Sequence, residues 1–146
     1  MKQIFSKSWK GSKQPRKQRK HRFNAPMNVR RKMMASNLSK ELRKKYGKRS
    51  FPVVKGDNVK ILRGEFKGKI GRVDKINYKK FKITIDGVYR TKKDGSKVPV
   101  LIHPSKVQIK ELHLEDSKRK KALERKMIKK DETKKSYKNK EGKVKW

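Results

Sequence analysis

The sequence predicts a mainly β fold, a small closed barrel with short basic helices and extended N- and C-terminal arms. Three observations support this prediction. Between residues 51 and 110 apolar residues alternate with polar ones, with the period of two that half-buried strands show. Gly-Asp or Asp-Gly pairs at 56–57, 86–87 and 94–95 separate the strand-like runs as turns. Outside this region lysine and arginine dominate, and hydrophobic residues are too sparse for a second core.

The charge of the chain indicates a polyanionic partner. The 146 residues contain 48 Lys and Arg against 13 Asp and Glu, which gives a formal net charge of +35. A free protein with this charge repels itself strongly, and a nucleic acid relieves that repulsion. Only 31% of the residues are hydrophobic, so one modest domain can form a core and the rest is expected to be appendage.

Residue types that are missing exclude several classes of function. The chain has no cysteine, and therefore no disulfide, zinc knuckle or thiol nucleophile. Its histidines, His21, His103 and His113, lie in separate segments, and no carboxylate pair is framed by apolar residues. We therefore expect no catalytic activity, no metal site and no cofactor. No run approaches the roughly 18 apolar residues of a membrane span, and no apolar face adjoins the charge, so no membrane contact is expected.

Residues 1–22 are expected to form a basic arm that is disordered without a partner. Lys, Arg, Gln, Ser, Gly and Pro dominate this segment, and it shows no hydrophobic period. It lacks the apolar centre of a secretion signal, and Gly11 and Pro15 interrupt the amphipathic face that a mitochondrial transit peptide would need. A soluble intracellular protein is the expectation.

Residues 23–50 predict two short basic helices. In the first, Asn24 can act as N-cap with Pro26 in the first turn. In the second, Ser36 or Asn37 is the expected cap and Gly47 the C-terminal stop. Apolar residues spaced by four mark one face of each helix, Val29 with Met33 and Leu38 with Leu42 and Tyr46. With so little acid nearby, the basic faces opposite are expected to contact RNA.

Residues 51–110 are the predicted barrel. The residues expected to mark its strands are Val59, Ile61, Val73, Phe81, Ile83, Ile85, Val107 and Ile109. The Asp94-Gly95 pair, in the run KKDGSK, is expected at the tip of a hairpin. Closure into a barrel is expected because a small sheet cannot otherwise hide its edges.

Residues 111–146 predict a basic helical extension. Asp116 or Ser117 can cap a helix in which Leu123 and Met127 stand four apart among lysines and arginines. The Lys-rich remainder, 131–146, is expected to be unstructured.

One segment of the barrel, KGDNVKILRGEFKGKIGRV at 55–73, has the most specific pattern. Its glycines stand at positions 64, 68 and 71, and its basic residues include Arg63, Lys67 and Lys69. The glycines are expected to adopt positive φ and to let an RNA backbone approach, while the cations beside them contact phosphate. The same glycines can also be plain turn residues. This segment resembles the KOW motif, which ribosomal proteins share with transcription elongation factors.

The flanks of this segment narrow the resemblance. The most specific runs are NAP at 24–26, LSKELR at 38–43, RS at 49–50 and IHPSKV at 102–107. With the KOW segment, they resemble the archaeal and eukaryotic form of the universal KOW family of large-subunit ribosomal proteins, numbered twenty-four in bacteria and twenty-six in eukaryotes. The resemblance covers about residues 12–130.

This resemblance implies an SH3-like KOW barrel and a structural constituent of the large ribosomal subunit. It implies binding and stabilisation of the 5′ domain of the large-subunit rRNA, a role in assembly, and a position near the polypeptide exit tunnel. The implied partners are that rRNA and neighbouring ribosomal proteins, with the chain a monomer within the ribosome. The implied location is on cytoplasmic ribosomes, with a nucleolar stage during assembly if the organism is a eukaryote. The alternative is a KOW-type transcription elongation factor, but an acidic-and-apolar polymerase-binding domain does not fit in 146 residues.

The residues expected to contact rRNA come from every segment of the chain. They are Arg16, Lys17, Arg19, Lys20, Arg22, Arg30, Arg31, Lys32, Lys40, Arg43, Lys44, Arg49, Arg63, Lys67, Gly68, Lys69, Arg72, His103, Lys106, Arg119 and Arg125. His103 precedes Pro104 at the start of a strand, so a purely structural hydrogen-bonding role is the alternative for it.

Overall fold

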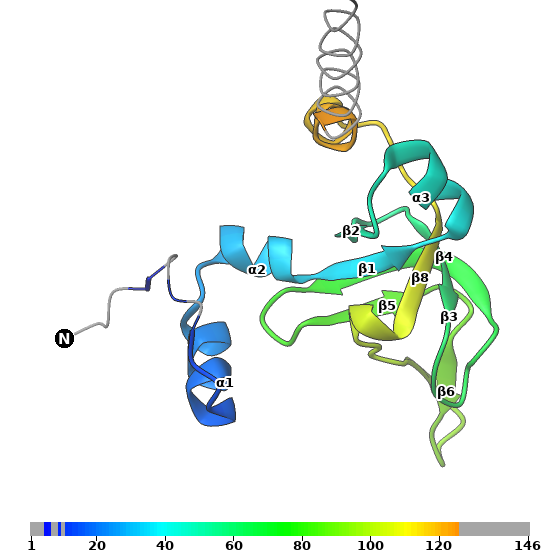
Figure 1. The fold of residues 1–146 in the computed structure, drawn as a ribbon. Helices are drawn as coiled ribbons and strands as arrows, with labels where there is room; N and C mark the ends of the chain where they lie inside the picture. Colours follow the sequence, from blue (N-terminus) through cyan, green and yellow to red (C-terminus); the bar gives the residue numbers. More distant parts are fainter. Residues whose placement is uncertain (1–4, 7–8, 10, 126–146) are drawn as a thin grey trace, which may run out of the picture.

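The computed structural model describes residues 5–6, 9 and 11–125 (Figure 1). Its helices are α1 Pro15–Asn24, α2 Met27–Met33, α3 Lys40–Tyr46 and the 3-10 helix η1 Pro104–Lys106, and helical structure also covers 117–125. Its strands are β1 Ala35–Leu38, β2 Ser50–Pro52, β3 Asn58–Ile61, β4 Ile70–Asn77, β5 Lys82–Ile85, β6 Tyr89–Thr91, β7 Lys97–Pro99 and β8 Val107–Glu111. The predicted strand-rich class is confirmed.

Six strands form one mixed sheet in the order β2-β1-β8-β3-β4-β5. Strands β1 and β8 run parallel, and the other neighbours are antiparallel. The sheet curls until β5 meets the segment before η1, where Ile83 N donates to Ile102 O at 2.8 Å and Ile102 N donates to Ile83 O at 2.9 Å. The result is the small barrel-like fold that the sequence predicts.

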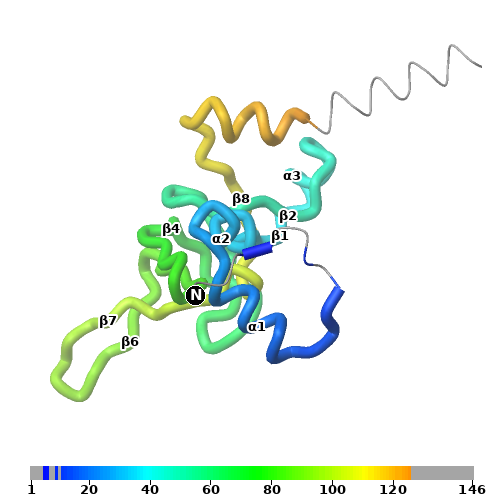
Figure 2. The backbone as a smooth tube through the Cα atoms, turned by 90° about the vertical axis from the view of Figure 1, so that its left-hand side faces the viewer, coloured from blue at the N-terminus to red at the C-terminus, as the bar shows by residue number. Residues whose placement is uncertain are grey.

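Strands β6 and β7 form a separate ribbon that projects from the barrel (Figure 2). Its register pairs Arg90 with Val98, and Gly95 at the tip has a φ of 80°. The Asp94 carboxylate accepts hydrogen bonds from the backbone N–H and the hydroxyl of Ser96, at 3.0 and 2.6 Å. These contacts confirm the predicted hairpin turn.

The hydrophobic core is formed by the residues that the period of two predicts. Val59, Ile61, Val73, Phe81, Ile83, Ile85, Val107 and Ile109 are all buried. Met34, Leu38, Phe51, Val53, Val88, Ile102 and Leu123 complete the cluster. Each fully buried side chain of this size stabilises the fold by roughly 1.5–3 kcal/mol relative to exposure.

The segment before α3 is a strand, and the predicted helix cap there is wrong. Strand β1 lies between β2 and β8, and it buries Leu38 completely. Ser36, one of the two expected caps, donates from its hydroxyl to Pro104 O at 2.6 Å. The cap of α3 is Ser39, whose Oγ accepts from Leu42 N at 3.3 Å. Gly47, with a φ of 62°, ends the helix as predicted.

The N-terminal helices also differ from the prediction. Helix α1 occupies part of the segment that shows no hydrophobic period, and none of its residues is buried. Pro15 stands at its first turn, a position that proline favours because it needs no N–H donor there. Asn24 is the last residue of α1, so it cannot cap the next helix, and Pro26 is the N-cap of α2.

The helix at 117–125 packs onto the barrel through Leu123, which is 1% exposed. Asp116 caps it, because its carboxylate accepts from Lys118 N at 2.8 Å, as predicted. The expected pairing with Met127 and the expected irregular tail at 131–146 lie outside the described residues. None of the helices in the described part of the chain is long and apolar enough to span a membrane.

Candidate nucleic-acid interface

The KOW loop, residues 62–69, joins β3 to β4 in a tight turn. Gly68 N donates to Ile61 O at 2.8 Å, and Ile61 N donates to Lys69 O at 2.9 Å. Gly64 and Gly68 have φ values of 98° and 92°, and a Cβ at either position would meet no atom within 4 Å. Glycine is needed here for the backbone conformation, and the outer side of the loop is open to a ligand.

Gly71 differs from the other two glycines, and the positive φ predicted for it is wrong. It lies in β4 with strand conformation, where a Cβ would stand 2.6 Å from Asp86 O and 2.7 Å from Ile85 Cγ2. The missing side chain lets β4 pack closely against the end of β5. The close approach of β5 thus explains glycine at this position.

The basic side chains of the KOW loop are exposed. Arg63, Lys67 and Lys69 all point to solvent, and Lys69 Nζ lies 5.1 Å from the centroid of the Phe66 ring. The one acid of the loop, Glu65, pairs with Arg90 Nη2 at 2.7 Å. The three cations thus stand free of the neighbouring carboxylate and can approach phosphate.

A second group of cations lies around His103, next to the KOW loop. A cavity of about 160 Å³ is lined by Arg63, Lys82, His103 and Lys106 among others. The Nδ1 atom of His103 lies 2.8 Å from Ser105 Oγ and accepts from Ser105 N at 3.2 Å, which caps η1. Burial, and then the charges of Arg22, Lys82 and Lys106, lower the pKa of His103 below 6.5. The three cations make the surroundings of His103 positive, which favours an anion beside them.

Helix α1 reaches the same region through the turn between β4 and β5. The Arg22 guanidinium carbon lies 4.7 Å from the centroid of the Phe81 ring, and that of Arg30 lies 5.8 Å from it. Phe81 has a φ of 54°, which a non-glycine residue adopts only when its surroundings hold it there. These contacts attach α1 and α2 to the barrel, and Arg22 lies close enough to His103 to lower its pKa.

The remaining predicted residues are spread over the surface. The exposed ones are Arg16, Lys17, Arg19, Lys20, Arg31, Lys32, Lys40, Lys44, Arg49, Arg72 and Arg125. Arg30 and Arg43 are half-buried, since Arg30 Nε donates to Ala25 O and Arg43 Nε donates to Leu38 O, each at 2.8 Å. Both arginines therefore donate to backbone carbonyls, and both side chains remain partly exposed to solvent.

Arg119 is a correction to the predicted set. Its side chain is 6% exposed, and both terminal nitrogens donate to the Asp57 carboxylate at 2.7 Å. They also donate to His113 O and Pro52 O, at 2.6 and 3.2 Å. The fold uses Arg119 to join the C-terminal helix to the barrel, so we remove it from the candidate RNA ligands.

Acidic residues gather at a different place, around a cavity of about 770 Å³. Asp74, Asp86, Glu115 and Asp116 line it, together with Arg72. Arg72, which lines this cavity, is paired in the sheet with Asn58 at the start of β3. The other end of β3 leads into the KOW loop. Lys55 and Arg119 also line this cavity, so its lining is of mixed charge. In the His103 cavity the one lining carboxylate, Glu65, is paired with Arg90, so that cavity is the better candidate for phosphate.

Sequence reasoning missed Lys82, which the structure places in the His103 cavity. The alternation along β5 could have found it, since Ile83 and Ile85 point inward and Lys82 stands next to them. The approach of Arg22 to His103 had no signal in the sequence, because the two residues are 81 positions apart and meet only through the turn at Phe81.

Comparison with known proteins shows the family of the chain. The family of ribosomal proteins that comprises the eukaryotic L26 and the archaeal L24 proteins matches residues 12–126. The chain belongs to this family. The large ribosomal subunit protein uL24 of Korarchaeum cryptofilum (strain OPF8) is 49% identical to it over 121 residues, which cover 83% of this chain and 92% of the relative. As a member of this ribosomal protein family, the chain is a structural constituent of the large ribosomal subunit.

Proposed function

We propose that this ribosomal protein binds large-subunit rRNA through one basic face. We define the basic face by six side chains: Arg22, Arg63, Lys67, Lys69, Lys82 and Lys106. The observation that carries the proposal is the convergence of four of them around His103: Arg22 from α1, Arg63 from the KOW loop, Lys82 from β5 and Lys106 from η1. Lys67 and Lys69 are exposed on the same loop as Arg63. The acids around the 770 Å³ cavity stand apart from this face.

Recognition on this face rests on phosphate and shape. The basic face holds long flexible cations and an open glycine turn, which suit contacts with the RNA backbone. Folded RNA presents backbones at fixed distances, and a rigid barrel with cations at fixed positions selects among such surfaces. Binding is therefore expected to depend strongly on salt.

The likeness to the family supports a finer statement of the role. We propose that the RNA bound is the 5′ domain of the large-subunit rRNA and that binding assists assembly. In the assembled subunit, the protein is proposed to lie near the polypeptide exit tunnel. Neighbouring ribosomal proteins are the other proposed partners, with the chain a monomer within the ribosome. Its proposed place is on cytoplasmic ribosomes, after a nucleolar stage if the organism is a eukaryote.

Gel-shift titration with isolated rRNA domains tests the proposal. The chain should bind the 5′-domain transcript more tightly than transcripts of equal length from other domains of the same rRNA. Reversing two cations of the basic face, Lys67→Glu with Lys69→Glu, should remove most of that preference. The matched control is Lys120→Glu with Lys121→Glu, which makes the same change of charge on exposed residues of the helix at 117–125. Equal binding of all transcripts by the wild-type chain would contradict the 5′-domain assignment.

A further inference from the structure

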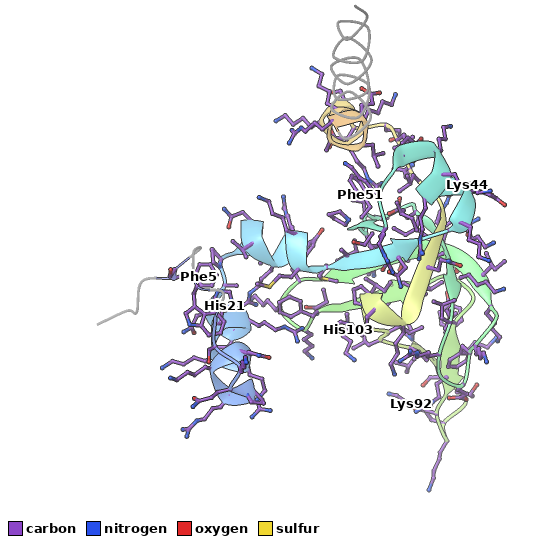
Figure 3. All side chains as sticks on the ribbon, viewed as in Figure 1. Phe5, His21, Lys44, Phe51, Lys92 and His103 are labelled. Carbon is purple, nitrogen blue, oxygen red and sulfur yellow. The ribbon has the colours of Figure 1, made fainter. Side chains whose placement is uncertain are left out.

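Two aromatic rings from the segment before α1 gather around His21 of α1, outside the His103 cavity. The ring centroids of Phe5 and Trp9 each lie 4.6 Å from that of His21, at interplanar angles of 32° and 23° (Phe5 and His21 are labelled in Figure 3). A cavity of about 280 Å³ opens beside them, lined by Phe5, Ser6, Trp9, Lys17, Lys20, His21 and Asn24.

This ring cluster is not part of the hydrophobic core. The core cluster of the described residues begins at Met34, and helix α1 has no buried residue. Phe5, Trp9 and His21 are half-buried, and the rings of Phe5 and Trp9 both contact that of His21. An aromatic cluster outside the core still exposes stacking surface to a ligand, which a core aromatic does not.

The charged side chains that line the cavity among the described residues are both lysines. Lys17 and Lys20 line the cavity, and Arg16 and Arg19 stand on the same helix. The first acidic residue of the whole sequence is Glu41. A ligand for this cavity should therefore be both planar, to match the rings, and anionic, to match the lysines. A nucleotide has both properties.

We propose that the cavity binds a single unpaired nucleotide of RNA, with its base stacked on Trp9 and its phosphate held by Lys17 and Lys20. The proposal rests on the rRNA binding proposed above and adds a specific subsite to it. The cavity, at about 280 Å³, is slightly smaller than typical small-molecule sites, which start at about 300 Å³, so it has room for one nucleotide at most. Stacking on aromatic side chains is how proteins commonly hold bases that have left a duplex.

His21 gives this site a polar group as well as a ring. Its Nε2 atom is covered and has no hydrogen-bond partner among the described residues. A buried polar atom without a partner costs free energy, so a small rotation of this ring toward the cavity is favoured if a base edge can pair with it. The site can thus combine stacking on Trp9 with one hydrogen bond from His21.

Intrinsic fluorescence tests the proposal directly. The chain has two tryptophans, and Trp146→Phe leaves Trp9 as the one fluorophore of its kind in the full chain. Hexa-adenylate RNA should quench Trp9, whereas an abasic ribose-phosphate strand of equal length and charge should not. In anisotropy titrations with labelled hexa-adenylate, Trp9→Ala should bind about tenfold more weakly, as expected for one lost base stack. Trp9→Phe should recover most of the affinity, because it keeps an aromatic face.

Tyr89→Ala is the matched control, since it removes an exposed aromatic ring from β6 and should leave hexa-adenylate binding unchanged. Equal affinity of Trp9→Ala and its parent, or equal quenching by the abasic strand, would overturn the nucleotide site. A different result would contradict the proposed rRNA binding: the variant that combines Lys67→Glu with Lys69→Glu would bind the 5′-domain transcript as well as the wild type does. Unchanged thermal unfolding of Trp9→Ala, expected because the cluster lies outside the core, excludes a folding defect.

Discussion

Asp57 and Arg119 form a buried bidentate ion pair that joins the barrel to the C-terminal helix. Both carboxylate oxygens accept from the guanidinium at 2.7 Å, and the Asp57 side chain is completely inaccessible. The same carboxylate also accepts from Val54 N and His113 N, each at 2.9 Å. One buried charge thus organises the turn before β3, the segment after β8 and the helix at 117–125.

Arg119→Ala should lower the free energy of unfolding by about 3–5 kcal/mol, because it leaves the Asp57 carboxylate buried without its counter-charge. Urea denaturation followed by circular dichroism measures this loss. Arg125→Ala, on the exposed end of the same helix, is the control and should change stability by less than about 0.5 kcal/mol. A loss for Arg119→Ala as small as that of Arg125→Ala would show that the pair does not hold the helix in place.

Lys67→Glu combined with Lys69→Glu should weaken rRNA binding sharply without changing the melting temperature. Both side chains are exposed on the KOW loop, so the substitutions leave the apolar core intact. Val59→Asp is the opposite case, since it buries an unpaired carboxylate in a fully buried position and should unfold the barrel. The two variants should separate on a plot of melting temperature against affinity. If the double Glu variant still joins large subunits as well as wild type, the loop is only a structural turn.

Binding to the rRNA should fall steeply with salt. Ten phosphate contacts give a slope of about −7 for log affinity against log salt concentration, from roughly −0.7 per contact with single strands. Filter binding between low and physiological salt measures the slope. A value shallower than about −3 would be incompatible with an interface that phosphate contacts dominate.

The protonation of His103 should report on RNA at the basic face. In the free protein its pKa lies below 6.5, because burial and the charges of Arg22, Lys82 and Lys106 disfavour the cation. An RNA phosphate near these groups adds negative charge and should raise that pKa, which an NMR titration of the His103 ring protons follows. No change of the His103 pKa on saturation with rRNA would place the phosphates elsewhere.

The same lowered pKa sets the sign of a pH effect on stability. Below pH 6.5 the unfolded chain binds a proton at His103 more readily than the folded chain does. The contribution of His103 to stability is therefore complete above pH 6.5 and declines as the pH falls below that value. In His103→Asn, which keeps a cap acceptor for Ser105 N, this part of the pH dependence should disappear from urea denaturation curves.

Helix α1 should gain order when RNA binds. It has ten residues and none is buried, and isolated helices shorter than about 12–15 residues are marginal in water. Amide hydrogen exchange should therefore show α1 exchanging much faster than Val59 or Ile83 in the free protein, and slower after RNA is added. Protection of α1 in the free chain equal to that of Val59 would contradict coupled folding.

The sequence by itself determined the features that depend on near neighbours in the chain. The alternation around Val59 and Ile61 follows from the period of a strand, so it predicted their burial. Gly47 ended α3, and the Asp94-Gly95 pair turned a hairpin, because a helix stop and a tight turn need particular residues at particular places. The net charge predicted a polyanionic partner, because the net charge of a chain does not depend on how it folds.

Only the tertiary structure decided the features that depend on distant neighbours. Ser36 and Leu38 fit a helix pattern, but β2 and β8 supply hydrogen-bond partners on both sides, so the segment is a strand. Arg119 looks like any surface cation until Asp57, 62 positions earlier, is placed beside it. Gly71 reads as a turn glycine until the end of β5 fills the space of its missing side chain. Local preferences are weak, and a buried partner outweighs them wherever the fold brings one close.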